Sequence, residues 1–218
     1  MKTLIVSGGW LRPAFLREKW EELCPDLLIA ADRGMDYALD AGLIPDLIVG
    51  DYDSAEGTSA AHFRERGVPF RTYPARKNYT DTEAAVREAL GAGSTEILIF
   101  GATGGRLDHF LANLECLLIP LEAGVPCALI DEQNRITLRK EPFTVRRKTA
   151  FGSYFSFFAL GESVEDLTLA GFRYPLQGHT LRKGSSLCVS NELEEASGAV
   201  TFSRGILLMV ESKDREEG

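Results

Sequence analysis

The sequence predicts an α/β domain with a mostly parallel sheet flanked by helices, followed by a small all-β domain resembling an antiparallel sandwich or jelly roll. Up to about residue 130, short apolar runs alternate with helical stretches, whereas after about residue 134 short β-rich segments follow one another without helices. The chain has 218 residues, of which 44% are hydrophobic and 26% charged, so it can bury a substantial core. We therefore expect two domains, 1–133 and 134–218.

The first half alternates strand and helix patterns. Its apolar runs lie at residues 3–8, 26–32, 46–51, 69–74, 96–101 and 126–131. Between them, segments 80–93 and 106–118 place apolar residues three and four positions apart, as amphipathic helices do. Gly42 and Gly93 stand where helix C-caps are expected. Strands separated by helices pair in parallel, so this half predicts a parallel sheet covered by helices.

The second half consists of short segments rich in β-branched and aromatic residues, separated by Gly, Pro and Asn. These segments lie at 135–141, 143–148, 154–160, 163–171, 186–193, 199–205 and 206–212. Seven strands without intervening helices predict a small antiparallel sandwich or barrel. We expect the phenylalanines of 155–158, together with Trp10 and Trp20, to lie in the core.

Charge and cysteine usage exclude several classes of protein. The formal net charge of −8 argues against a nucleic-acid-binding surface. The start, MKTLIVSGGW, has too short an apolar run for a signal peptide, and no run of 18 apolar residues occurs, so we expect a cytoplasmic protein that does not enter a membrane. The four cysteines are widely spaced and form no CxxC pattern, which predicts neither a zinc site nor a disulfide framework.

Two carboxylates follow a buried strand in the segment DLIVGDYDS, residues 46–54. In an extended backbone Asp51 and Asp53 point to the same side, where two like charges repel unless a cation lies between them. Mg²⁺ prefers carboxylate oxygens and shares them with substrate phosphates. The alternative is a hydrogen-bonded turn, because Asp and Ser are common turn residues. The pair therefore indicates either a magnesium site or a simple turn.

Three further acids fall at the same predicted edge of the sheet. Asp32 ends the second run, Asp81 opens a helix after the fourth, and Asp108 follows the fifth. Taken singly, Asp81 and Asp108 are better explained as helix N-caps. In an open parallel sheet, however, ligands bind beyond the carboxyl ends of the strands. Five carboxylates on that edge are more than turn chemistry needs and favour a metal–ligand site.

The same edge carries a glycine loop. In IFGATGGR a strand ends, Gly104 and Gly105 follow, and Arg106 stands where a helix begins. Backbone N–H groups in such a loop can bind an anion, and the helix N-terminus adds partial positive charge. The segment is neither a P-loop nor GxGxxG, so a tight turn is the alternative, and Lys77 is by itself an ordinary solvated lysine. Acids for Mg²⁺ beside cations for phosphates are what phosphoryl transfer requires.

Four segments of the chain together resemble a known family. The segments ADRGMDYAL…PDLIVGDYDS, PARKNYTDTEAAV, GATGGRLDHFLANL and LTLAGFRYPL…GSSLCVSNEL are together similar to the thiamine pyrophosphokinase family, in its bacterial style. The resemblance covers about residues 28–205 and keeps the order of the GDxDS, K-x-x-TD and GGRxDH motifs. Two positions depart from the pattern: Arg33 replaces a glycine that many members have, and Tyr52 is the aromatic between the two acids.

The resemblance implies an N-terminal nucleotide-binding and catalytic domain and a C-terminal thiamine-binding sandwich. It implies a homodimer with active sites between subunits, and Mg²⁺-dependent transfer of a pyrophosphoryl group from ATP to the hydroxyl of thiamine, giving thiamine diphosphate and AMP. By position, it assigns Mg²⁺ to Asp51, Asp53 and Asp81, ATP to Asp32, Lys77, Thr80, Arg106 and Asp108 with the loop glycines Gly104 and Gly105, and thiamine to Tyr174, Ser190 and Asn191. Asp81 and Asp108 are both candidates for the group that accepts the hydroxyl proton.

Three alternatives remain open on the sequence alone. A related pyrophosphokinase acting on a hydroxymethylpterin would share the nucleotide half, but the VSNE segment favours thiamine. Haloacid-dehalogenase phosphatases also begin with a D-x-D after a strand, although on their first strand, whereas here it ends the third. A nucleotide sensor without catalysis would keep the glycines but has no need of five acids.

Overall fold

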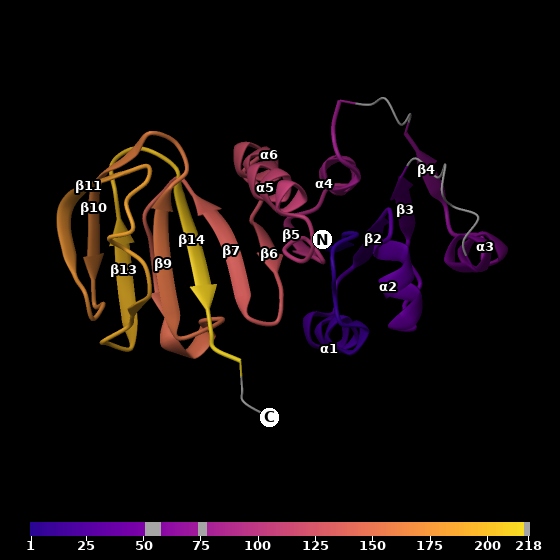
Figure 1. Ribbon diagram of the computed structural model, residues 1–218, viewed down its shortest axis with the longest axis horizontal. Helices are drawn as coiled ribbons and strands as arrows, with labels where there is room; N and C mark the ends of the chain where they lie inside the picture. Colours follow the sequence, from indigo (N-terminus) through magenta and orange to yellow (C-terminus); the bar gives the residue numbers. More distant parts are fainter. Residues whose placement is uncertain (51–57, 74–77, 216–218) are drawn as a thin grey trace. The chain divides into compact units, whose positions relative to one another are not determined.

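The computed structural model describes residues 1–50, 58–73 and 78–215. It divides into two compact units, Met1–Glu132 and Gln133–Gly218, each with its own strands. Figure 1 shows the elements of both. Three of the expected site residues, Asp51, Asp53 and Lys77, lie outside the described residues.

The first unit contains a parallel sheet, as predicted. Its strands are β1 (Lys2–Val6), β2 (Leu27–Ala31), β3 (Leu47–Gly50), β4 (Phe70–Thr72), β5 (Glu96–Phe100) and β6 (Cys127–Ile130). They lie in the order β6-β5-β1-β2-β3-β4, and every neighbouring pair is parallel. Each of the six apolar runs forms one strand, and β1, β2 and β5 are almost entirely buried, because both faces of the sheet are covered.

Helices cover both faces of this sheet. They are α1 (Pro13–Leu23), α2 (Gly34–Asp40), α3 (Thr58–Glu65), α4 (Asp81–Gly91), α5 (Leu107–Cys116) and α6 (Leu118–Glu122). In Figure 1, α1 and α2 lie on one side and α4, α5 and α6 on the other. The two predicted C-cap glycines are confirmed: Gly42 and Gly93 have φ values of 66° and 85°, which suit glycine at the end of a helix.

The second unit contains two antiparallel layers. Strands β12 (Asn191–Glu192), β9 (Tyr154–Ala159), β14 (Leu207–Ser212) and β7 (Asn134–Arg139) are neighbours in that order. The second layer is β11 (Leu176–Arg182), β10 (Ser163–Ala170), β13 (Ser197–Thr201) and β8 (Phe143–Arg146), and a 3₁₀ turn, Arg147–Thr149, follows β8. Every neighbouring pair within the two layers is antiparallel, so the predicted fold class of this unit is confirmed.

Two details of the second unit differ from the sequence prediction. Strand β11 was not expected, because its residues are mostly exposed and only Leu181 is fully buried, which leaves little apolar alternation to detect. Conversely, the expected strand at 186–193 shrinks to the two residues of β12. Leu187 and Val189 are exposed there, and Ser190 has φ 55°, a left-handed conformation that interrupts an extended chain.

The core predictions are partly confirmed. Phe155 and Phe157 are buried and each meets the ring of Phe172 edge-on, at 5.9 and 5.7 Å between centroids. Trp10, by contrast, was wrongly expected in the core: it is 63% exposed, because it lies in the loop after β1 rather than on a strand. Trp20 is only partly buried.

All four cysteines are free thiols. Cys116 and Cys188 are buried, Cys127 is partly buried, and Cys24 is exposed. Burial raises the pKa of Cys116 to about 12, and it raises the pKa of Cys127 and Cys188 as well. Within the described residues, no helix is both long and apolar enough to cross a membrane.

Candidate active site

The order of the strands locates a crevice in the first unit. From β1 the chain continues outward through β2, β3 and β4, and then returns to place β5 and β6 on the other side of β1. The connections therefore leave β1 and β5 in opposite directions. In open parallel sheets, ligands bind at such a reversal, beyond the carboxyl ends of the strands. The loops that follow β1 and β5 are thus the expected walls of a ligand site.

These two loops are joined through their backbones. The amide of Ser7 donates to the carbonyl of Phe100 at 2.8 Å, and the amide of Gly9 donates to the carbonyl of Gly101 at 2.8 Å. A Cβ on Gly9 would lie 2.4 Å from the carbonyl oxygen of Gly104, which is closer than any side chain can approach. Glycine is therefore required where the loops meet.

The loop after β2 packs closely against the end of β1. A Cβ on Gly34 would lie 1.9 Å from the carbonyl oxygen of Val6. Asp32, two residues earlier, has φ 48° and donates its backbone amide to Val49 at 2.9 Å. A left-handed aspartate is uncommon and is tolerated best at constrained sites. Three successive strand ends, those of β1, β2 and β5, thus form one interlocked edge.

The conformation of the glycine loop, residues 101–105, depends on its glycines and on a hydrogen bond from α5. Gly101 and Gly105 have φ values of 67° and 100°, which glycine adopts without strain. The buried side chain of Asn113, on α5, donates from Nδ2 to the carbonyl of Ala102 at 2.9 Å. Hydrogen bonds to the carbonyls of Gly101 and Ala102 therefore hold the first part of the loop in place.

At the end of this loop, Arg106 and Asp108 bind one another. The guanidinium donates from Nε to Oδ1 of Asp108 at 3.1 Å and from Nη2 to Oδ2. Both side chains are exposed, at 75% and 60%. Hydrogen bonding to Arg106 lowers the pKa of Asp108, and that to Asp108 raises the pKa of Arg106. Asp108 is therefore a weaker proton acceptor than an ordinary aspartate, and Arg106 is held at the mouth of the loop.

The start of α4 reaches the same edge. Thr80 is the N-cap residue, and its hydroxyl accepts a hydrogen bond from the amide of Glu83 at 3.2 Å. Asp81 is the first residue of the helix, and the hydroxyl of Thr82 is hydrogen-bonded to that of Ser7, at the end of β1. The partly buried carboxylate of Asp81 is thus tied, through its neighbour, to the loop after β1.

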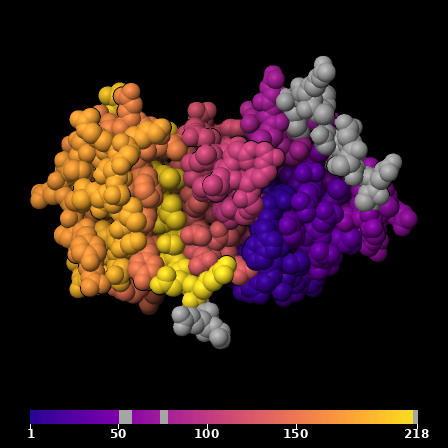
Figure 2. Space-filling model, viewed as in Figure 1, coloured from indigo at the N-terminus to yellow at the C-terminus, as the bar shows by residue number. Residues whose placement is uncertain are grey.

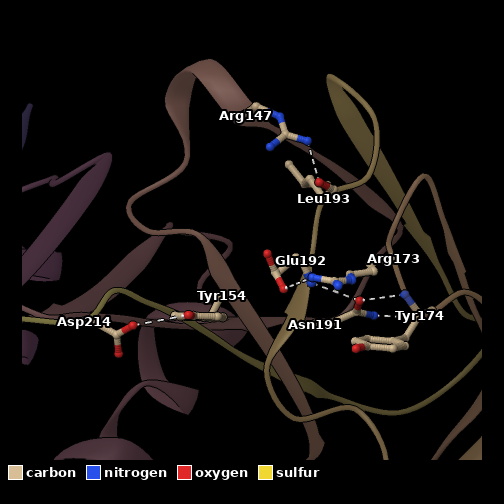
Figure 3. A network of polar contacts seen from close by, with 8 residues as sticks. All are labelled: Arg147, Tyr154, Arg173, Tyr174, Asn191, Glu192, Leu193 and Asp214. Atoms are coloured by element: carbon tan, nitrogen blue, oxygen red, sulfur yellow. Dashed lines mark hydrogen bonds and ion pairs between the residues drawn. The ribbon is translucent and has the colours of Figure 1, made fainter.

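Two of the expected thiamine residues, Tyr174 and Asn191, are joined by hydrogen bonds in the second unit (Figure 3). Tyr174 is 60% exposed, and Ser190 is also exposed. Asn191, in contrast, is only 2% exposed. Its Oδ1 accepts from the amide of Tyr174 at 3.0 Å, and its Nδ2 donates to the carbonyl of Tyr174 at 2.8 Å. The three residues are neighbours in space, but they differ in what they present to a ligand.

Comparison with known proteins decides the family. The family model described as "Thiamin pyrophosphokinase, catalytic domain" matches residues 18–129, and that described as "Thiamin pyrophosphokinase, vitamin B1 binding domain" matches residues 140–207. Thiamine pyrophosphokinase of Bacillus subtilis (strain 168) is 38% identical over 224 residues, which cover 98% of this chain and 100% of that one. The chain belongs to the thiamine pyrophosphokinase family.

Solved structures of thiamine pyrophosphokinases have the same fold. The crystal structure from Bacillus subtilis matches with a TM-score of 0.86 and 32% identity, over 99% of this chain and 100% of that one. The structure from Geobacillus thermodenitrificans matches with a TM-score of 0.84 and 35% identity, over 99% of both chains. The catalytic-domain match lies within the first unit and the vitamin B1 match within the second. The chain is therefore a thiamine pyrophosphokinase family enzyme, as its motifs predicted, rather than a member of the phosphatase or pterin alternatives.

Sequence reasoning missed several residues that shape the site. Trp10 lies against the glycine loop, since a Cβ on Gly104 would meet its backbone oxygen at 2.7 Å. Gly9 and Gly34 make the close approaches described above, and Asn113 supports the loop from α5. The doubled glycine in SGGW, directly after a strand, was the signal for a close backbone approach. An asparagine on the buried face of a helix gives no comparable signal.

Proposed function

We propose that this enzyme transfers the pyrophosphoryl group of ATP to the primary hydroxyl of thiamine, giving thiamine diphosphate and AMP. Family membership supports the reaction. The observation that supports its place in this chain is the interlocked edge between β1 and β5, where the glycine loop ends in Arg106. Triphosphate binding needs backbone donors and a cation held in fixed positions, and this edge offers both.

We assign Mg²⁺ to Asp51, Asp53 and Asp81. The donor chemistry fits, because all three are carboxylates and Mg²⁺ binds oxygen. The positions of the neighbouring described residues also fit a metal site: Asp81 is partly buried at the carboxyl edge of the sheet, and β3 ends at Gly50, directly before Asp51 in the sequence. When bound, Mg²⁺ offsets the negative charge of the phosphates. The role of the protein is to hold the three carboxylates at one place on this edge.

We assign the phosphates of ATP to the loop amides of Gly104 and Gly105, with Lys77 and Arg106 as the cations. Thr80 and Asp32 lie at the same edge, where Thr80 fixes the start of α4 and Asp32 borders Gly8, whose Cβ would lie 3.6 Å from Oδ2. Asp108 orients the Arg106 fork through its two hydrogen bonds. Because this pairing lowers the pKa of Asp108, that carboxylate is poorly suited to accept the proton of the thiamine hydroxyl.

We assign thiamine to the second unit. The exposed ring of Tyr174 offers a face on which the pyrimidine stacks, and the exposed hydroxyl of Ser190 offers a hydrogen bond. We further propose that the enzyme is a cytoplasmic homodimer with active sites between subunits. Sedimentation equilibrium tests the dimer, and a monomeric species that turns over at full rate would exclude sites between subunits.

The reaction is tested by phosphorus NMR of the purified enzyme with ATP, Mg²⁺ and thiamine, beside a sample without thiamine. Formation of AMP together with thiamine diphosphate, only when thiamine is present, is the expected result. ADP with thiamine monophosphate would instead mean ordinary kinase chemistry. Release of phosphate without thiamine would mean hydrolysis, and turnover of a pterin alcohol but not of thiamine would overturn the substrate.

The metal assignment is tested by Asp51→Asn. We expect turnover to be lost while the far-ultraviolet circular dichroism and the melting temperature stay unchanged, because the substitution keeps the size of the side chain. Asp46→Asn is not a suitable control, since Asp46 accepts a backbone hydrogen bond from Leu28. Asp40→Asn, at the exposed end of α2, is the matched control and should remain active. An active Asp51→Asn enzyme would remove the metal assignment.

A further inference from the structure

Asn191 uses three of the four hydrogen-bonding positions of its side chain on the backbone of its own chain. Its Oδ1 accepts from two backbone amides, those of Tyr174 at 3.0 Å and Glu192 at 2.9 Å, and its Nδ2 donates to the carbonyl of Tyr174 at 2.8 Å. Two N–H donors facing one atom and a carbonyl facing the other also fix the orientation of the amide. With the side chain only 2% exposed, its polar atoms serve the backbone around Tyr174.

Tyr174 is held from its other side as well. Phe172, two residues earlier, is buried against Phe155 and Phe157. Between them, Arg173 donates its backbone amide to the carbonyl of Glu192 at 2.8 Å and binds the carboxylate of Glu192 at 2.8 Å. The Arg173 guanidinium also lies 5.9 Å from the centre of the Tyr174 ring. The turn is therefore anchored in the core at Phe172, and at its other end it is clamped by Asn191, as Figure 3 shows.

The segment that carries Asn191 is itself fixed. The guanidinium of Arg147 donates to the carbonyls of Leu193, Glu194 and Glu195, the last two at 3.2 and 3.1 Å. On the other side, the amide of Ser190 donates to the hydroxyl of Ser156 at 3.0 Å. Because both flanks of Asn191 are restrained, its amide is a stationary point against which the Tyr174 backbone is positioned.

We infer that Asn191 is a positioning residue, which sets the Tyr174 ring for stacking on the aromatic pyrimidine of the substrate and does not contact the substrate itself. The inference rests on the proposed function for the identity of the substrate, but the clamp on Tyr174 is independent of it. It changes the role expected from the sequence, where Asn191 was a thiamine ligand. An exposed aromatic ring stacks well only if its backbone is fixed beforehand, since ordering a mobile turn on binding costs affinity.

A double-mutant cycle separates positioning from direct contact. We expect Asn191→Ala to raise the KM for thiamine roughly tenfold, the change that losing one or two net hydrogen bonds produces, with kcat and the KM for ATP changing much less. Tyr174→Ala should raise it about ten- to a hundredfold, as loss of base stacking does. In the Tyr174→Ala background, Asn191→Ala should add little. Fully additive effects would mean that Asn191 contacts thiamine directly and would overturn the inference.

Amide hydrogen exchange tests the clamp without any substrate. Asn191→Ala should speed exchange at the amides of Tyr174 and Glu192, whereas the amide of Gly178 should keep its rate. The matched control is Thr168→Val, which removes the hydroxyl that accepts from Gly178 at 3.0 Å in the same unit. It should speed exchange at Gly178 and leave the KM for thiamine unchanged. Unaltered exchange at Tyr174 in Asn191→Ala would overturn the clamp.

A failure of the proposed function is recognised separately. If the wild-type enzyme does not act on thiamine but Asn191→Ala still frees the Tyr174 amide, the substrate is wrong and the clamp stands. Should the alanine variant not fold, Asn191→Asp keeps an acceptor for both amides but turns a carboxylate oxygen toward the Tyr174 carbonyl in place of the N–H donor. It should therefore also free the Tyr174 segment, and additivity with Tyr174→Ala would again count against the inference.

Discussion

The guanidinium of Arg106 and the carboxylate of Asp108 form a two-pronged ion pair at the end of the glycine loop, with Nε 3.1 Å from Oδ1 and Nη2 bound to Oδ2. The pair lies at the start of α5, which is at the surface of the first unit (Figure 2). Since Asp108 is held ionised by its partner, the arrangement fixes a cation rather than providing a base. The motif GGRLDH does not show whether its aspartate fixes the arginine or accepts a proton, and this ion pair favours the first role.

Asp108→Asn tests this separation. The lowered pKa means that Asp108 stays ionised until the pH falls below the ordinary range of an aspartate, so it does not titrate near neutrality. We expect kcat to fall at every pH while the shape of the pH profile near neutrality is unchanged. If the substitution removes a titration step from that profile, Asp108 is the base. Arg106→Lys should also lower activity, because an ammonium cannot reproduce the guanidinium fork.

Thr80 has a structural role that can be separated from ATP binding. Its hydroxyl caps α4, and replacing such a cap by alanine costs about 1 kcal/mol of stability. We expect Thr80→Ala to lower the free energy of unfolding by that amount in urea denaturation, and Thr80→Ser to restore most of it. If both variants keep the wild-type KM for ATP, Thr80 acts only as a cap. A higher KM in Thr80→Ala alone supports its assignment to ATP.

Two glycines, one at the interlocked edge and one at the end of a helix, give opposite predictions for substitution by alanine. Gly34→Ala places a Cβ 1.9 Å from the carbonyl oxygen of Val6, so we expect severe loss of stability or of soluble expression. Gly91→Ala, at the end of α4, meets nothing within 4 Å and replaces a poor helix former. It should stabilise the protein by about 0.5–1 kcal/mol. Thermal unfolding of the two variants measures the contrast, and a stable Gly34→Ala protein would contradict the close approach.

Trp10 should report on ligands at the glycine loop. Its backbone lies against Gly104 and its side chain is 63% exposed, so binding of ATP at the loop should change the surroundings of the indole. We expect a saturable change in tryptophan fluorescence on titration with ATP and Mg²⁺. The same titration of Trp10→Phe, in which Trp20 remains, should show little change. A signal that persists in Trp10→Phe would place the reporter at Trp20 instead.

The parallel sheet was predictable because buried strands leave continuous apolar runs in the sequence, and each of the six runs became one strand. Strand β11 was not predicted because its exposed side chains leave no alternation of apolar and polar residues. The strand predicted at 186–193 was too long because Leu187 and Val189 are apolar but exposed. The prediction for Trp10 was wrong for the same reason, since large aromatic residues are usually buried but this one is exposed. The spacing of apolar residues indicates which positions are buried, so a prediction based on it fails where an apolar residue is exposed.

The site was predictable to the extent that motifs place residues at strand ends. Asp32, Asp81 and Arg106 lie at the carboxyl edge of the first unit, as the alternation of strands and helices implied. The motifs did not reveal that Arg106 binds Asp108, that Thr80 caps α4, or that Asn191 is buried. These relationships depend on side-chain direction and on backbone approach between distant loops, which neither spacing nor composition encodes.

Of the four cysteine thiols, that of Cys24 is the exposed one, which gives this enzyme a single position for labelling with a dye. Cys24, at the C-cap of α1, is exposed, whereas burial raises the pKa of the other three and so keeps them from forming the reactive thiolate. A maleimide dye at neutral pH should therefore modify one residue per chain without any engineering. Because Cys24 follows a helix that leads away from the glycine loop, the dye can be used for anisotropy or single-molecule work while the proposed site stays unmodified.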